Sequence, residues 1–334
     1  MTSTRPNDTI VDLSGLASGA DDNPFPGFIA ACDGDATKIQ EAYDSHRTRR
    51  NAAQKDKFLA DGTTLAPDLI LRGLLKHKEQ DSRNCLVIWT RPPGHIIALA
   101  HRVQEMITGG LPASWEHWLM PTHNMHMTVA EVAFSQPPAQ IAALVQHLRP
   151  HAAALAHTSY THRARLVRPL LSFDTSAFAL SFVPASGEPL LAPRMAAMTA
   201  ASLPAPAPEA QPAAHDDAYT YHHLRRDVFA RLLDTGVRPA PRYQVPSAHI
   251  TLGRFISGGA GGDGDPGTPV AAEDAQRWVR CVEEINEWLR ATYWANDDVD
   301  SSGEWIVGQE RGLDVRYGPV WYGGGKTVVM GEGF

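Results

Sequence analysis

The sequence is poor in cysteine, in long apolar runs and in excess positive charge. Its 334 residues include only Cys32, Cys85 and Cys281, an odd number without paired spacing, which argues against a disulfide framework and a cysteine-built zinc site. No apolar run approaches the roughly 18 residues of a membrane-spanning helix, and residues 1–25 are polar rather than signal-like. The net charge of −7 excludes a broad nucleic-acid-coating surface, although not a grip on one phosphate. We therefore expect an intracellular protein, cytoplasmic or nuclear, with no membrane partner and no evident obligate protein partner.

The order of the expected elements indicates an α+β protein. Before an alanine- and proline-rich stretch, the pattern predicts strands and helices at 85–91 (strand), 94–110 (helix), 124–134 (strand), 137–156 (helix), 163–173 and 176–185 (strands). After that stretch, it predicts elements at 218–237 (helix), 243–256 (strand), 271–294 (helix), 304–318 and 326–333 (strands). Because both halves repeat a similar alternation, we predict two pseudo-symmetric lobes, with antiparallel sheets flanked by helices and a groove between them.

The chain is expected to divide into an N-terminal extension and a bilobal domain. Residues 1–83 form the extension, with a peripheral helix at 36–60 whose apolar stripe is thin. Arg47, Arg49 and Arg50 on that helix are interpreted as a solvated face rather than an RNA contact. The domain is predicted to consist of a first lobe at 84–185, an insertion or linker at 186–217 and a second lobe at 218–333.

Two stretches repeat one polar pattern inside otherwise apolar strands. In "PSAHITLGRF", His249 and Thr251 lie two positions apart. In "HNMHMTVAEV", His126 and Thr128 repeat that spacing. Side chains two apart on a strand share one face, so each strand presents an imidazole and a hydroxyl together. A single His-x-Thr is usually structural, but two copies predict two halves of one site.

Two histidines that face one substrate can divide acid and base catalysis between them. An unperturbed imidazole titrates near pH 6.5, so it can start in either protonation state near neutrality. In-line displacement at phosphorus needs a proton removed from the attacking oxygen and another delivered to the leaving oxygen. His126 and His249 are therefore the predicted catalytic residues. Thr128 and Thr251 are predicted to donate hydrogen bonds to the phosphate oxygens, and no metal is required.

At these residues the chain resembles the two-histidine phosphoesterase superfamily, which includes RNA ligase-like cyclic phosphodiesterases. The family signature is two copies of His-x-Ser/Thr-x followed by apolar residues, matched here by "HMTV" (126–129) and "HITL" (249–252). The resemblance covers roughly residues 84–333 in element order. Among larger relatives, the chain most resembles fungal and eukaryotic proteins labelled RNA ligase/cyclic nucleotide phosphodiesterase. The separation between the two copies is longer than in compact members, largely through the insertion.

The resemblance implies hydrolysis of a 2′,3′-cyclic phosphate or a related RNA-end phosphodiester, without a metal or cofactor. The implied partner is a nucleotide or RNA-end substrate. By analogy with the hydrolytic members, His249 would be the base that activates water, and His126 the acid that protonates the departing ribose oxygen.

Aromatic and basic residues near the motif strands are further candidates. Tyr243, Trp321 and Tyr322 could stack on a nucleobase, although core packing is the favoured interpretation for each. Arg254 follows the second motif, but strict strand alternation directs it away from His249.

The segment "WYGGGKT" ends like a phosphate-binding P-loop. The full pattern needs a glycine at position 320, where the chain has valine, and a strand rather than a helix is expected after it. We therefore expect a turn between strands.

Three functional classes remain open at this stage. The first is a phosphodiesterase, and the second is a nucleotide or RNA-end binding module of the same fold. The third is a metal hydrolase that uses His123, His126 and the region of His222, although His222 and His223 are expected at the surface.

Overall fold

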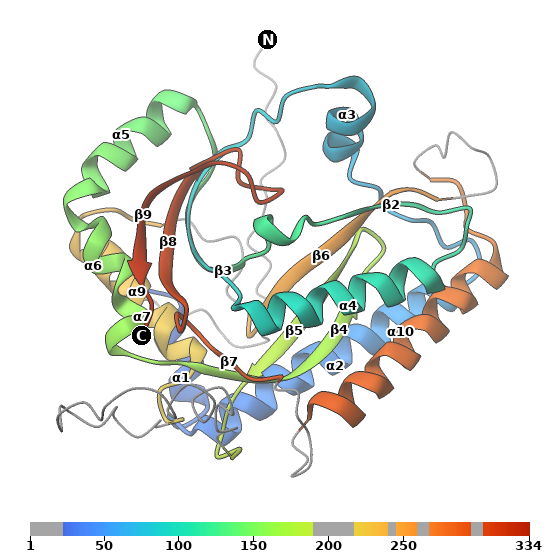
Figure 1. Cartoon of the computed structure of the whole chain (residues 1–334), viewed down its shortest axis with the longest axis horizontal. Coiled ribbons are helices and arrows are strands. Elements are labelled where there is room, and N and C mark those ends of the chain that lie inside the picture. The colour runs from blue at the N-terminus through green and yellow to red at the C-terminus, as the bar shows by residue number, and fades with distance from the viewer. Residues whose placement is uncertain (1–22, 190–216, 240–244, 259–266, 295–302) are drawn as a thin grey trace, which may run out of the picture.

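The structure, a computed structural model, describes residues 23–189, 217–239, 245–258, 267–294 and 303–334. Across these ranges the chain forms two antiparallel sheets flanked by helices, which confirms the expected α+β class (Figure 1). The first sheet has the order β3-β1-β8-β9 and contains β1 (Asn84–Thr90), β3 (Met127–Gln136), β8 (Arg311–Gly318) and β9 (Lys326–Glu332). The second has the order β2-β6-β5-β4-β7 and contains β2 (Glu116–Leu119), β4 (Arg165–Phe173), β5 (Ala177–Pro184), β6 (Ala248–Ser257) and β7 (Trp305–Ile306).

Each sheet draws strands from both halves of the chain. β1 pairs with β8, for example Leu86 opposite Tyr317, and β5 pairs with β6, for example Ser181 opposite His249. The segment expected as one strand at 304–318 is two strands, with β7 in the second sheet and β8 in the first. The lobe boundaries expected from chain order therefore do not separate the sheets, because pairing partners need not be neighbours in sequence. Most of the insertion 186–217 lies outside the described residues.

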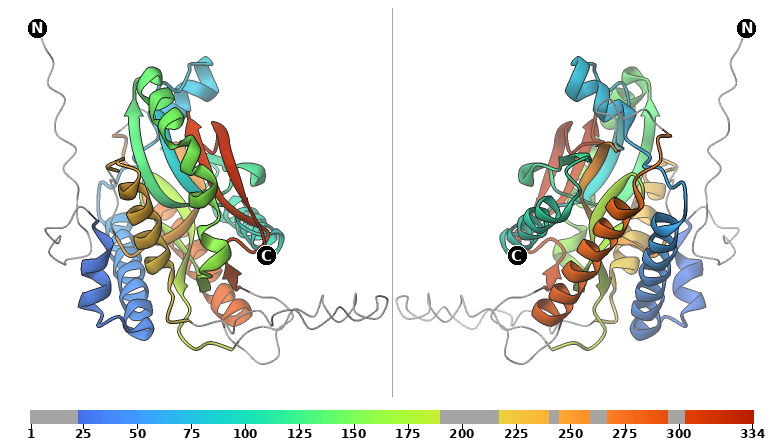
Figure 2. Two further views of the ribbon diagram at one scale, coloured as in Figure 1. Left: turned by 90° about the vertical axis from the view of Figure 1, so that its left-hand side faces the viewer. Right: turned by 90° about the vertical axis from the view of Figure 1, so that its right-hand side faces the viewer.

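Helices cover the outer surfaces of both sheets. α4 (Gly94–Gly110) packs against β6, α10 (Ala272–Tyr293) against β4, and α2 (Ala36–Leu59) beside α10 against β4 and β5 (Figures 1 and 2). α5 (Pro138–Leu148) and α6 (Ala152–Ala156) pack against the first sheet, and α9 (Tyr221–Asp234) against β3. The remaining helical segments are α1 (Phe25–Ala31), α3 (Leu69–His77), α7 (Thr158–Thr161), η1 (Thr122–Asn124) and η2 (Arg149–His151). Within the described residues, no helix is long and apolar enough to cross a bilayer.

The helix expected to be peripheral, α2, is part of the core. The Asp35 carboxylate begins the helix by accepting hydrogen bonds from two backbone N–H groups. Ile39, Tyr43 and Phe58 then pack into the main hydrophobic cluster. Arg47 is only 5% exposed, and its guanidinium donates to the Arg168 carbonyl at 2.6 Å. The thin apolar stripe was misleading because a hydrogen-bonded arginine occupies a position that a sequence pattern counts as solvated.

The seam between the N-terminal helices and α9 contains a buried histidine. His222 has no exposed surface, and its ring lies 4.3 Å from that of Phe28 and 5.3 Å from that of Phe25. Its Nδ1 shares a 2.9 Å hydrogen bond with the Tyr43 hydroxyl. The expectation that His222 and His223 lie at the surface is therefore wrong, since α9 is covered on this side by α1 and α2.

Burial of His222 predicts a loss of stability in mild acid. Burial, with the nearby charges of Arg225 and His223, lowers the pKa of His222 well below its ordinary value, so the folded protein keeps this ring neutral. The unfolded chain binds the proton below about pH 6.5, so unfolding is favoured by about 1.4 kcal/mol per pH unit below that point. Urea unfolding from pH 7.5 to 4.5 should give a steeper loss for the wild type than for His222→Asn, by about one proton. Parallel curves would show that His222 does not resist protonation.

Candidate functional site

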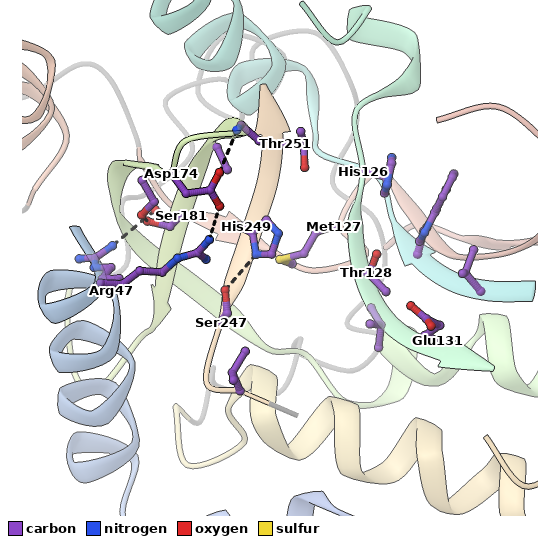
Figure 3. A pocket seen from close by; sticks show the side chains of 18 of the residues that line it. Arg47, His126, Met127, Thr128, Glu131, Asp174, Ser181, Ser247, His249 and Thr251 are labelled. Atoms are coloured by element: carbon purple, nitrogen blue, oxygen red, sulfur yellow. Dashed lines mark hydrogen bonds and ion pairs between the residues drawn. The ribbon is translucent and has the colours of Figure 1, made fainter. Parts of the chain in front are cut away.

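A cavity of about 820 Å³ lies where the two motif strands meet (Figure 3). Its lining includes all four residues that the sequence singled out, namely His126, Thr128, His249 and Thr251. The first two come from β3 and the residue before it, and the last two from β6. Two segments far apart in sequence thus present imidazole and hydroxyl groups to one space.

β3 departs from strict alternation at three register shifts, one of them opposite the stretch from Asn84 to Leu86 of β1. Ile88 pairs with Ala130 but the next residue of β1 pairs with Thr128, and a second shift occurs two residues earlier in β1. Each shift adds one residue to β3, so Thr128, Glu131 and Phe134 all line the cavity at intervals of three. Counting alternate positions from His126 reaches Thr128 and Phe134 but misses Glu131.

A bulge in β6 also reverses the direction of one arginine. Phe178 pairs with Gly253 and Ala179 with Thr251, which leaves one extra residue on β6. Gly253 is required here, because a Cβ atom would lie 2.4 Å from the Phe178 ring and 2.6 Å from a backbone oxygen of β2. After the bulge, Arg254 lines the cavity, so the expectation from strict alternation that it points away is wrong.

His126 is held from three sides. Its Nδ1 donates to the Asn124 carbonyl at 2.8 Å, and its ring stacks on Trp89 with centroids 3.6 Å apart. Arg91 donates to the carbonyls of Asn124 and Met125, and its ion pair with a buried aspartate on β8 holds it in place. Desolvation in the cavity wall, the charge of Arg91 and the neighbouring second imidazole lower the pKa of His126 to about 3, although the Asn124 carbonyl opposes this shift.

His249 is more exposed than His126, and it too has arginine side chains nearby. Its Nδ1 shares a 2.9 Å hydrogen bond with the Ser247 hydroxyl. More than a third of the residue is exposed to the cavity, yet desolvation by the walls and the charges of Arg50 and Arg225 lower the pKa of His249 to about 4. The Asp174 carboxylate opposes this shift. Because both pKa values lie well below 7, both imidazoles are neutral at pH 7.

α9 fastens the two motif strands to one another. The Tyr221 hydroxyl donates to the Thr128 carbonyl at 2.8 Å. Arg225, which is 6% exposed, donates to the carbonyls of Val129 on β3 and Val245 just before β6, at 3.3 and 2.9 Å. Both half-sites are thus held by one helix, which fixes their spacing.

Arginines that the sequence did not assign to the site make one wall of the cavity. Arg47, Arg49 and Arg50 of α2 line it, together with Arg225 and Arg254. The solvated-face interpretation is wrong for Arg47, which is buried, whereas Arg49 and Arg50 are exposed as expected but also line the cavity. The run of arginines is visible in the sequence, but only the packing of α2 against β5 shows that these side chains reach the cavity.

The aromatic candidates have different locations. Trp321 lines the cavity, with its ring 5.4 Å from that of Phe134 and 4.8 Å from the Arg83 guanidinium. Tyr322 is not in the lining, and its hydroxyl donates to Asp68 at 2.8 Å while accepting from Arg83. Tyr243 lies outside the described residues.

The glycine-rich segment after β8 is a turn, as expected. Gly323 and Gly325 have φ values of 80° and 83°, and β9 begins at Lys326. Among the described residues, no three His, Cys, Asp or Glu side chains lie close enough together to hold a metal ion.

No protein-family model and no curated protein sequence matches this chain. The chemistry of the cavity therefore follows from its side chains alone. Each imidazole has Nδ1 bonded to the protein, which leaves Nε2 as the atom for a ligand. Two such nitrogens, two hydroxyls and a cationic wall suit a phosphate ester, because they can exchange protons with its oxygens and balance its charge.

Proposed function

We propose that this protein is a metal-independent phosphodiesterase that hydrolyses 2′,3′-cyclic phosphates or related RNA-end phosphodiesters, as a member of the two-histidine phosphoesterase superfamily. The observation that carries the proposal is the joint lining of one cavity by His126, Thr128, His249 and Thr251. A fold that needed these groups only for packing would not bring both pairs to one cavity.

The two imidazoles are assigned to opposite ends of the displacement. Nε2 of His249 removes a proton from water, and the water oxygen forms the new bond to phosphorus. The bond from phosphorus to the ribose oxygen breaks, and Nε2 of His126 delivers a proton to that oxygen. The product is a nucleoside monophosphate, and proton exchange with solvent restores both rings. The Asn124 carbonyl supports His126 as the acid, since an acceptor at Nδ1 stabilises the imidazolium form.

The acid must obtain its proton together with the substrate. Both imidazoles are neutral at pH 7 before substrate binds, so neither carries the proton that the acid must donate. An incoming phosphate brings negative charge into the cavity, which favours a protonated imidazole beside it. Nearby arginines repel both imidazolium forms, Arg91 and Arg316 at His126 and Arg50 and Arg225 at His249, so the assignment of acid and base rests on the Asn124 carbonyl and on the resemblance.

The threonine hydroxyls are expected to stabilise the transition state. Thr128→Val and Thr251→Val each remove one hydrogen-bond donor while nearly preserving side-chain shape. We expect each to lower kcat/KM for a 2′,3′-cyclic nucleotide by about 10- to 150-fold, equal to about 1.5–3 kcal/mol of transition-state binding. Steady-state kinetics should show wild-type values for the control Thr161→Val, an exposed position on α7. A loss below twofold in both cavity variants would remove the threonines from the mechanism.

A binding module is the second candidate, and one observation favours it. Two neutral imidazoles can recognise an RNA end without ever completing a proton transfer. Incubation of the purified chain with adenosine 2′,3′-cyclic phosphate in EDTA distinguishes the two functions. The phosphodiesterase proposal predicts many turnovers to adenosine 2′- or 3′-monophosphate. Saturable binding with no product would identify the binding module, and activity that EDTA abolishes and zinc restores would identify metal chemistry.

A further inference from the structure

The cavity extends well beyond the two histidines on the side of the second sheet. The β5 residues that pair with His249 and Thr251 are Ser181 and Ala179, both of them small, and both line the cavity. These two residues form a floor of small side chains beside His249, between β6 and α2. The α2 wall reaches this floor, because the Arg47 guanidinium donates to the carbonyl of Ser181, the residue that pairs with His249, at 3.4 Å. A cyclic phosphate held between the histidines would not fill this space.

The wall at the end of this floor carries an anchored arginine. The Arg50 guanidinium lies 2.6 Å from the Asp174 carboxylate, and the two side chains remain 42% and 26% exposed. The other oxygen of Asp174 accepts hydrogen bonds from the Ser176 backbone and hydroxyl and from the Ala177 backbone, so the turn between β4 and β5 fixes it. Figure 3 shows Asp174 on the same side of the cavity as Arg47 of α2.

Stability alone does not explain this ion pair. Exposed pairs contribute only about 0–1 kcal/mol, so a partly open pair at the wall of a cavity adds little to the fold. Arg49 lies next to Arg50, lines the same wall and is exposed. The charge of Arg50 also reaches the reacting centre, since it is the largest charge effect on the pKa of His249. The Arg50 guanidinium thus lies near the position proposed for the first phosphate, and the floor of small β5 residues separates the two.

We infer that Arg50, with Arg49 beside it, binds a second phosphoryl group of the substrate while the first lies between the histidines. This inference rests on the proposed function of the same cavity. The substrate class is then a 2′,3′-cyclic phosphate whose nucleotide carries another phosphate on its 5′ side. Trp321 and Phe134, whose rings lie 5.4 Å apart, also line the cavity and offer an aromatic surface for the base. The 5′-side phosphoryl group is either a phosphomonoester on a mononucleotide or the phosphodiester of an RNA chain.

Substrates that differ only on the 5′ side test the inference. Adenosine 2′,3′-cyclic phosphate, its 5′-phosphorylated form and the dinucleotide ApA with a 2′,3′-cyclic phosphate should be compared by kcat/KM. We expect the second phosphoryl group to raise kcat/KM by about 10- to 100-fold, as charge-assisted hydrogen bonds would. A gain for the mononucleotide alone would identify a phosphomonoester site, and a gain for the dinucleotide an RNA-chain site. Equal values for all three substrates would overturn the inference.

Two variants separate the arginine from its partner. Arg50→Gln leaves the Asp174 charge uncompensated, so the ratio of kcat/KM with and without the 5′-phosphate should fall below 1. Arg50→Gln combined with Asp174→Asn removes both charges and should return this ratio to about 1. Arg102→Gln, an exposed position on α4 outside the cavity, should keep the wild-type ratio. A wild-type ratio in both cavity variants would overturn the inference.

A binding measurement distinguishes failure of the inference from failure of the proposed hydrolysis. Adenosine 2′,5′-bisphosphate and adenosine 2′-monophosphate should be titrated into the protein by calorimetry. We expect the bisphosphate to bind about 10- to 100-fold more tightly to the wild type, less tightly than the monophosphate to Arg50→Gln, and about equally to the double variant. Tighter binding without turnover of any cyclic substrate would uphold the second site and reject hydrolysis. Equal affinities would reject the second site whatever the turnover.

Discussion

His126→Gln and His249→Gln are each expected to lower kcat for cyclic phosphate hydrolysis by about two to four orders of magnitude. Glutamine retains polarity and much of the ring volume but cannot exchange a proton at neutral pH. Because both imidazoles act in one step, the double variant should lose far less than the product of the two single losses. Steady-state kinetics in EDTA measures all three variants.

The matched control for these variants is His101→Gln. His101 lies on α4 with its side chain 59% exposed, and it does not line the cavity. Circular dichroism and thermal melting should confirm that every variant is folded. Near-wild-type turnover in either folded cavity variant would reject a mechanism that needs both histidines.

The leaving group should separate the acid from the base. A 2′-deoxynucleoside 3′-(4-nitrophenyl phosphate) releases nitrophenolate, which departs without a proton. If His126 is the acid, His126→Gln should lose less than about tenfold on this substrate, against two to four orders of magnitude on the cyclic phosphate. His249→Gln should remain deficient on both, because water still needs a base.

Release of nitrophenolate can be followed by absorbance, so the comparison is made under identical conditions. The converse result, rescue of His249→Gln but not of His126→Gln, would exchange the two roles. Equal losses of both variants on both substrates would indicate that neither imidazole protonates the leaving oxygen.

Much of the fold could be predicted because its elements are locally encoded. The helix at 94–110 begins after a proline and has apolar residues at helical spacing, and the structure has α4 over those residues. Pairing across the insertion could not be predicted in this way. β5 pairs with the preceding strand β4 as a hairpin, but chain order gives no information that its other edge pairs with β6 across residues 186–217.

The pairs of the candidate site could be predicted, but not its walls. His126 and His249 stand out because one spacing occurs twice in apolar strands. Glu131 and Arg254 reach the cavity only through bulges, which shift the phase of a strand without an obvious mark in the sequence. Arg50 reaches the cavity because α2 packs against the second sheet. The composition of α2 does not reveal this tertiary contact.

The central claim is that two imidazoles share one phosphate, and NMR titration of the ring resonances tests it most directly. In the free protein, His126 and His249 should titrate well below pH 6.5, consistent with pKa values of about 3 and 4. Saturation with adenosine 2′-monophosphate should raise both pKa values, since a bound anion stabilises each imidazolium form, and the nucleotide should bind more tightly as the pH falls through this range. A rise for one ring while the other keeps its free value would contradict the account.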